Sequence, residues 1–188
     1  MAVLLFSMVP AYEAQPVAGI TDGATMDVIL VGDRMIDSVG SKVEIGIEES
    51  YPNSSTQTIS GENLGLDDHL GFYEEGLAPW SVALDDQSDF LILQPKSIDI
   101  AVQDGSSGDG SILATLEKLA EIADDMPAEP VLFMPWAHKN GDSNRPITMG
   151  DFTSMDSLIV NSTISLLDGL SSGIRYVIPA GAAFNIVY

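Results

Sequence analysis

Five short runs, four of them mainly apolar and one rich in threonine, predict the strands of a sheet. They are residues 28–31 (VILV), 56–60 (TQTIS), 90–93 (FLIL), 131–134 (VLFM) and 175–178 (RYVI). Each is followed within two residues by a glycine or a proline, the residues that most often end a strand. Short, mainly apolar runs are typical of central strands buried on both faces of a sheet.

Two later segments carry the signals of well-defined helices. Ser111 is a suitable N-cap for a helix whose apolar residues recur at helical spacing until Pro127. Asp151 or Thr153 caps a second, long amphipathic helix, for which Gly173 is the natural C-terminal stop.

Two earlier segments are less regular. Residues 35–47 predict a short helix, because Gly40 and Gly46 interrupt the apolar pattern. Residues 66–85 predict helical pieces that Pro79 breaks.

Strands that alternate with helical patterns indicate βαβ units with right-handed crossovers. We therefore predict a three-layer α/β/α sandwich around a mainly parallel, five-stranded sheet with flavodoxin-like strand order. No internal repeat or linker divides the sequence, so residues 24–188 are expected to form one domain.

The turn after the first run is the centre of this prediction. Gly32 ends the run, and Asp33 is an N-cap or turn residue. In an open α/β sheet, ligands bind beyond the carboxyl ends of the strands. The residues that this topology gathers at that edge are Asp33, Arg34, Gly61, Gln94, Ser97, Trp136, His138 and Gly181. We expect Gly32, Asp33, Gly61 and Gln94 to converge on one face.

The charge of the chain limits its partners. Its 188 residues include 28 acidic and 7 basic ones, a formal charge of −21. Such a chain repels nucleic acids and anionic membranes, so neither is an expected partner. The acidic residues are spread along the sequence, which favours a solvated acidic surface, with salt adaptation as one cause, over a cation-binding face. Cysteine is absent, which excludes disulfides, thiolate metal sites and cysteine nucleophiles.

Common cofactor motifs do not fit. Only one glycine follows the first strand, so a dinucleotide fingerprint is missing, and the glycine-rich loop 105–110 lacks the lysine of a P-loop. Asp104 and Asp109 would repel phosphate there, and their spacing does not match a calcium loop. We interpret this segment as an acidic loop and predict no cofactor.

The two histidines do not form a metal motif. His69 follows two aspartates in what we interpret as a solvated loop. His138 lies just past a strand end, where a structural role and a place lining the pocket both remain open. We predict no metal site.

The first residues suggest export. Residues 1–14 begin with an apolar run and reach a small-residue site, as in the end of a secretory signal, but they lack its basic start. We interpret them as a partial signal peptide of a secreted or periplasmic protein, the alternative being an apolar tail on a cytoplasmic one. No other segment is long and apolar enough for a membrane span.

The strand ends, taken in order, resemble those of the SGNH (GDSL-like) hydrolases. VILVGDR is similar to their first block, TQTISGENLG to the second and FLILQPKS to the third, while FMPWAHKNG and YVIPAGAAF are similar to later strand ends of one subgroup. The resemblance implies ester hydrolysis with a block-one serine nucleophile. It also implies an oxyanion hole that includes Gly61 and Gln94, with Ser97 nearby.

The sequence departs from this pattern at three places. Arg34 occupies the nucleophile position, and Ser38 is the nearest hydroxyl. Gln94 stands where many members have asparagine. The sequence reaches Tyr188 without the Asp-x-x-His pair that supplies the base, so we expect the domain to be incomplete at its C-terminus, with Val177 and Ile178 uncovered.

Three interpretations follow. The first is an SGNH-like domain of the acyl or carbohydrate ester hydrolase class that is inactive as written, because Arg34 replaces serine. The second is a non-catalytic α/β module that binds a small polar or anionic ligand at the strand ends near Arg34, with Asp33, Ser97, Trp136 and His138 as candidate binding residues. The third is a flavodoxin-like domain of unrelated function. A small-molecule or carbohydrate ester is the expected ligand, and the oligomeric state is left open.

Overall fold

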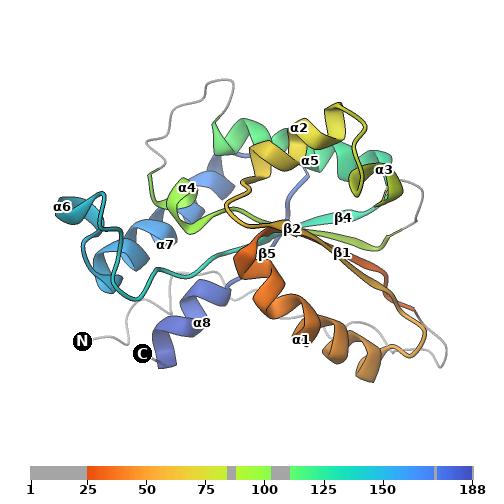
Figure 1. Cartoon of the computed structure of the whole chain (residues 1–188), viewed down its shortest axis with the longest axis horizontal. Helices are drawn as coiled ribbons and strands as arrows, with labels where there is room; N and C mark the ends of the chain where they lie inside the picture. The colour runs from red at the N-terminus through yellow and green to blue at the C-terminus, as the bar shows by residue number, and fades with distance from the viewer. Residues whose placement is uncertain (1–24, 84–87, 103–110, 172, 188) are drawn as a thin grey trace.

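Five parallel strands form one sheet in the order β2-β1-β3-β4-β5 (Figure 1). The structure is a computed structural model that describes residues 25–83, 88–102, 111–171 and 173–187. The strands are β1 (Val28–Asp33), β2 (Thr56–Gly61), β3 (Phe90–Gln94), β4 (Glu129–Phe133) and β5 (Tyr176–Ile178). The predicted strands and flavodoxin-like order are therefore confirmed.

The helices lie on both faces of the sheet, as predicted for a three-layer sandwich. They are α1 (Arg34–Ser50), α2 (Leu66–Glu74), α3 (Trp80–Ala83), α4 (Ser97–Ala101), α5 (Ile112–Asp125), α6 (Pro146–Met149), α7 (Phe152–Gly169) and α8 (Ala180–Val187). In Figure 1, α1 and α8 lie below the sheet, whereas α2, α3 and α5 lie above it.

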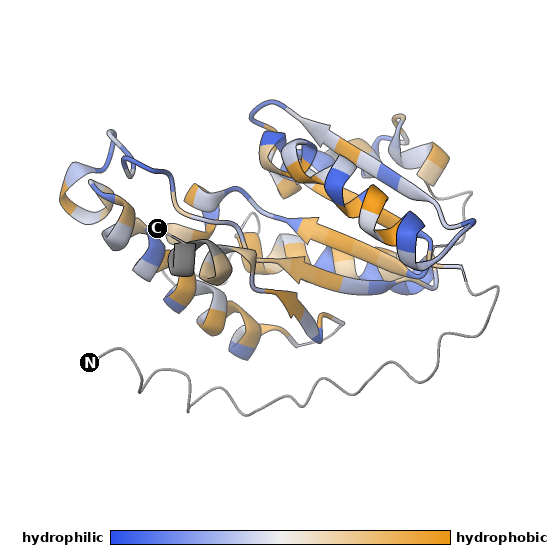
Figure 2. Ribbon diagram, turned by 90° about the horizontal axis from the view of Figure 1, so that it is seen from below, coloured by the Kyte–Doolittle hydropathy of each residue, from blue (hydrophilic) through white to orange (hydrophobic). Residues whose placement is uncertain are grey.

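Alternate residues of the strands point to opposite faces of the sheet and belong to two separate hydrophobic cores. Ile29 and Val31 of β1 pack with residues of α2, α4, α5 and α7, while Val28 and Leu30 pack with the apolar side of α1. Strands covered on both faces need apolar side chains at every position, which explains their continuous apolar runs. Figure 2 shows the central strands almost wholly orange, whereas the helices mix orange and blue.

Helix α1 is longer than the short helix predicted from the sequence. Its apolar stripe of Ile36, Val39, Val43 and Ile47 packs on the sheet along almost the whole helix. That burial outweighs the helix-weakening effect of two glycines, about 1 kcal/mol each. Gly40 moreover lets α1 approach β2, because a Cβ there would lie 2.9 Å from Oγ1 of Thr58.

The predicted stop of α7 at Gly173 is wrong. The helix begins after its N-cap Asp151, which is one of the two residues predicted for this role. It ends at Gly169. Leu170 is already extended while its N–H still donates to the carbonyl of Leu166. Gly173 instead takes a positive φ of 84° just before β5, where a Cβ would lie 2.6 Å from Cβ of Ala120.

The expectation that the sheet is left uncovered after β5 is also wrong. Helix α8 follows directly, its first residue Ala180 packs against the core on the α1 side, and Val177 and Ile178 are half-buried. None of the helices in the described ranges is both long and apolar enough to cross a membrane. Residues 1–14 and the acidic loop 104–110 lie outside the described residues, so the predictions for them stay predictions.

Candidate functional site at the carboxyl edge of the sheet

The carboxyl ends of β1, β2 and β3 bring the predicted residues together. Asp33 is the register partner of Gly61, and Gly32 is the partner of Gln94. Because β1 lies between β2 and β3, its last residues are flanked by both other strand ends. The predicted convergence of Gly32, Asp33, Gly61 and Gln94 is confirmed.

Glycine allows close packing at both strand ends. A Cβ on Gly32 would lie 2.8 Å from both Cβ and the carbonyl oxygen of Gln94. A Cβ on Gly61 would lie 2.8 Å from Cγ of Leu64. Both distances are shorter than non-bonded carbon contacts allow, so the two glycines let neighbouring segments approach the strand ends closely.

Gln94 is buried and its amide is used by the main chain. The side-chain carbonyl Oε1 accepts a hydrogen bond of 3.1 Å from the N–H of Asp33, and the amide nitrogen donates to the carbonyl of Pro95. Only 1% of Gln94 is exposed. The residue therefore links the end of β3 to the turn after β1.

Asp33 caps α1, as predicted. Its carboxylate accepts a 2.7 Å hydrogen bond from the N–H of Met35, in the first turn of the helix. A carboxylate at this position also interacts favourably with the positive end of the helix dipole. The cap fixes the residue at which α1 begins. It therefore also fixes the position of Arg34, the first residue of the helix.

Arg34 is the first residue of α1 and projects into solvent. Its side chain is 76% exposed, and its guanidinium lies 3.6 Å from the carboxylate of Glu62, just beyond β2. An ion pair so exposed adds little to stability. Five N–H donors therefore stand at the first position of α1, directly after the turn that ends β1.

The serine hydroxyls near Arg34 are bonded to other groups. Ser38 donates to the carbonyl of Arg34 at 3.1 Å, one helical turn back, and Ser60 donates to the carboxylate of Asp37. Ser97 is 2% exposed and donates to the carbonyl of Trp136 at 2.7 Å. None of the three pairs with a histidine in these hydrogen bonds.

Trp136 and His138 follow β4 but differ in their surroundings. Trp136 is half-buried, with its ring edge-to-face to Phe133 at 6.5 Å, and its carbonyl is the acceptor for Ser97. His138 is exposed, and its carbonyl accepts from the N–H of Gly141 in a tight turn. The structure thus joins Ser97 to Trp136, whereas the described hydrogen bond of His138 is local to its own loop.

The prediction that His69 is a solvated loop residue is wrong. It lies within α2, is 1% exposed, and its Nε2 is 2.9 Å from the carbonyl oxygen of Gly32. Asp67 and Asp68 mark the first turn of a helix here, because the carboxylate of Asp68 accepts from the N–H of Gly65 at 2.7 Å. Acidic residues are favourable in the first turn of a helix, so the pair Asp67 and Asp68 is as compatible with a helix start as with a loop.

Burial disfavours the charged form of the His69 imidazole. Burial lowers its pKa below 6.5, and this effect outweighs the hydrogen bond to Gly32 and the nearby charges of Asp68, Asp67 and Asp33, which all raise it. A carbonyl oxygen can only accept, so Nε2 carries the proton and donates.

A lysine and an aspartate complete the edge and were not singled out from the sequence. Lys96 donates to the carbonyl of Asn63 at 2.8 Å and so ties the end of β3 to the loop before α2. Burial raises the pKa of Asp99 in α4, although the charge of Lys96 opposes this shift. Isolated polar residues in loops and short helices give no periodic signal by which they could have been found.

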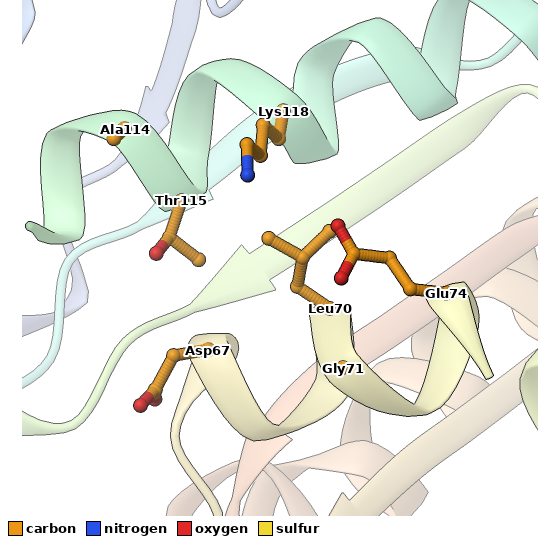
Figure 3. Close-up of a pocket in the computed structure, with 7 residues that line it drawn as sticks. All are labelled: Asp67, Leu70, Gly71, Glu74, Ala114, Thr115 and Lys118. Atoms are coloured by element: carbon orange, nitrogen blue, oxygen red, sulfur yellow. The ribbon is translucent and has the colours of Figure 1, made fainter. Parts of the chain in front are cut away.

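A hollow of about 160 Å³ lies between α2 and α5 (Figure 3). Its lining residues are Asp67, Leu70, Gly71, Glu74, Ala114, Thr115 and Lys118. Figure 3 shows these side chains coming from two facing helices over the sheet, rather than from the turn after β1. Among the described residues, no group of three or more histidines and carboxylates is arranged to hold a metal ion.

Comparison with solved structures places this fold among known ones. A protein from Slackia heliotrinireducens that is proposed to be an SGNH hydrolase matches with a TM-score of 0.64 and 14% identity, over 87% of this chain and 83% of its own. A catalytic mutant of an acetylxylan esterase from Geobacillus stearothermophilus matches with a TM-score of 0.56 and 15% identity, over 86% and 79%. An α/β hydrolase enzyme from the metagenome of Lake Arreo matches with a TM-score of 0.56 and 12% identity, over 87% and 82%.

The chain therefore has the three-layer fold of the SGNH, or GDSL-like, hydrolases, and the resemblance of its strand ends to that family is confirmed at the level of the fold. No protein-family model matches the sequence, and no curated protein matches it.

Proposed function

We propose that this domain is an ester-hydrolase relative that binds a small acylated carbohydrate at the carboxyl edge of its sheet and does not cleave it by serine chemistry. The observation that carries the proposal is Arg34 at the start of α1, the position at which the family resemblance implies a serine nucleophile. Gly32, Asp33 and Gln94 form the hydrogen-bonded frame that holds it.

Arginine cannot perform the covalent step. A guanidinium group carries hydrogen-bond donors only, so it has no lone pair with which to attack a carbonyl carbon. Its donors can instead bind the carbonyl oxygen of an ester or the hydroxyls of a sugar. The substitution thus removes the nucleophile and adds hydrogen-bond donors at the same point.

The neighbouring hydroxyls are poor substitutes for the missing serine. Ser38 and Ser97 both donate to main-chain carbonyls, and the buried Ser97 has 2% of its surface exposed. A serine nucleophile needs a base that accepts its proton, whereas a peptide carbonyl is far too weak a base for this task.

Charge favours a neutral ligand over a free carboxylate. Arg34 is offset by Glu62 at 3.6 Å, Asp33 and Asp37 are close by in sequence, and the whole chain carries −21. The negative charge of the protein would repel an anionic ligand at long range, whereas it would not repel an uncharged ester. The acetylxylan esterase among the matched structures supports the choice of an acetylated sugar as the first ligand to test.

The test compares binding and cleavage of the same compound. Acetylated xylo-oligosaccharide is titrated into the unmodified chain and into Arg34→Ala by calorimetry, and acetate release is followed in parallel. We expect binding by the unmodified chain, an affinity lowered by about tenfold in Arg34→Ala, as for the loss of a charge-assisted hydrogen bond, and acetate release at the buffer rate in both.

Arg175→Ala is the matched control, because this exposed arginine precedes β5 and so lies at the opposite, amino edge of the sheet. Its affinity should equal that of the unmodified chain. Saturable acetate release by the unmodified chain would disprove the non-catalytic assignment, and equal affinities of Arg34→Ala and Arg175→Ala would remove Arg34 from the ligand site.

A further inference from the structure

We propose that His69 is a positioning residue for the turn between β1 and α1: from α2 it holds the Gly32–Asp33 peptide unit, one residue before Arg34, and so it sets where Arg34 is presented. The effect of His69 on ligand binding rests on the function proposed above. Its effect on the position of the Gly32–Asp33 peptide unit does not depend on that function.

The hold acts on one peptide unit from two sides. The carbonyl of Gly32 and the N–H of Asp33 belong to the same planar amide and point in opposite directions. Nε2 of His69 lies 2.9 Å from that carbonyl oxygen, and Oε1 of Gln94 lies 3.1 Å from that N–H. Two bonds at opposite ends of a rigid plane fix its rotation, and the direction of α1 follows from it.

The His69 ring is itself fixed by aromatic neighbours. Phe72 lies edge-on to it at a centroid distance of 6.3 Å and Trp80 at 6.1 Å, and Trp80 is fully buried. The side chain is therefore packed into the core between α2 and the sheet rather than free to swing. A donor held this firmly can determine the position of its acceptor.

Packing alone does not explain a histidine at this position. Within the described part of the chain, Nδ1 of His69 is buried without a hydrogen-bond partner, which carries a desolvation cost that leucine or phenylalanine would avoid. The described hydrogen bond that offsets this cost is the one to Gly32. The hydrogen bond that Nε2 donates to Gly32 therefore explains why a histidine, rather than an apolar residue, occupies this position.

Hydrogen exchange can separate this role from a general contribution to stability. The unliganded chain, His69→Leu and His69→Gln are compared, and exchange is measured at the N–H of Asp33 and at that of Leu30 in the middle of β1. Glutamine keeps a donor near the position of Nε2, whereas leucine keeps bulk only. Phe72→Leu is the matched control, because it removes one aromatic neighbour of His69 but keeps the buried Trp80 against the ring and keeps the donating imidazole.

We expect exchange at Asp33, relative to Leu30, to rise by about tenfold in His69→Leu, as for the loss of one hydrogen bond. It should return to within about threefold of the unmodified value in His69→Gln and stay unchanged in Phe72→Leu. A residue that is only structural would change both amides in step, so parallel changes at Asp33 and Leu30, or no rescue by glutamine, would overturn the proposal.

Titration with acetylated xylo-oligosaccharide completes the test. Affinity should fall in His69→Leu and recover in His69→Gln, in parallel with exchange at Asp33. Failure of the unmodified chain to bind would count against the proposed function alone, because the exchange data on the unliganded protein still decide the role of His69. Binding that is equal in the unmodified chain and in His69→Leu would overturn the effect on Arg34.

Discussion

At the scale of single residues, the glycine of the β1–α1 turn and a glycine inside α1 should respond in opposite ways to the same change. A Cβ on Gly32 meets Gln94 at 2.8 Å, whereas a Cβ on Gly46 has nothing within 4 Å. Overpacking a buried site typically costs about 1–3 kcal/mol, and replacing an exposed mid-helix glycine by alanine gains about 0.5–1 kcal/mol.

We therefore expect Gly32→Ala to lower the free energy of unfolding and Gly46→Ala to raise it, as measured by urea denaturation. The Gly46 variant serves as the control for the added methyl group. A Gly32→Ala protein as stable as the unmodified one would show that the turn can move away from Gln94.

His69 should also make stability depend on pH. Its folded-state pKa lies below 6.5, chiefly through burial, although Asp33, Asp67 and Asp68 oppose this. As pH falls through 6.5, the unfolded chain takes up the proton first, so the folded state loses stability.

Urea denaturation at about pH 7.5 and about pH 5.5 should therefore show a smaller loss for His69→Gln than for the unmodified chain. Carboxylates titrate in both proteins and cancel in the comparison. An identical loss in the two proteins would mean that His69 does not keep a depressed pKa.

At the scale of elements, helix caps were the most readable signals and helix ends the least. Ser111 was predicted as an N-cap and Asp151 as one of two candidates for another, and each side chain accepts a hydrogen bond from the third residue of its helix. The end of α7 was misplaced because Gly173 fits a helix stop by sequence, whereas its positive φ serves the turn before β5. Tertiary packing also kept α1 helical through Gly40.

The cap of α5 offers a direct test at this scale. Oγ of Ser111 accepts from the N–H of Ala114 at 3.2 Å. Ser111→Ala should lower the free energy of unfolding by about 1 kcal/mol, while Ser111→Asn, which can still accept, should stay close to the unmodified value. Equal losses in both variants, measured by urea denaturation, would mean that the hydroxyl does not act as a cap.

At the scale of the whole molecule, topology was predictable and side-chain partners were not. The alternation of apolar runs and helices was enough to place Gly61 and Gln94 beside Asp33, because parallel strands end at one edge. The hydrogen bond from His69 joins residues 37 positions apart in sequence, and no periodic pattern records such a contact. The two aspartates before His69 even favoured the interpretation of His69 as a solvated loop residue, whereas it is buried.

The net charge yields a prediction for the molecule as a whole. With −21 on 188 residues, repulsion among like charges destabilises the compact state, and salt screens it. Raising NaCl from about 0.02 M to about 0.5 M, where the Debye length falls to a few ångströms, should raise the urea midpoint. A midpoint that stays constant or falls would show that the acidic residues are too far apart to repel measurably.

The exposure of Arg34 has a consequence for how such a domain can change over evolutionary time. Its side chain is 76% exposed, whereas Gly32, Gln94 and His69 beside it are held by packing and by hydrogen bonds. Selection for a stable fold alone therefore preserves the frame, while position 34 is left open to drift. A substitution at position 34 therefore leaves in place the turn geometry that presents this residue, and a later mutation at the same position would meet that geometry unchanged.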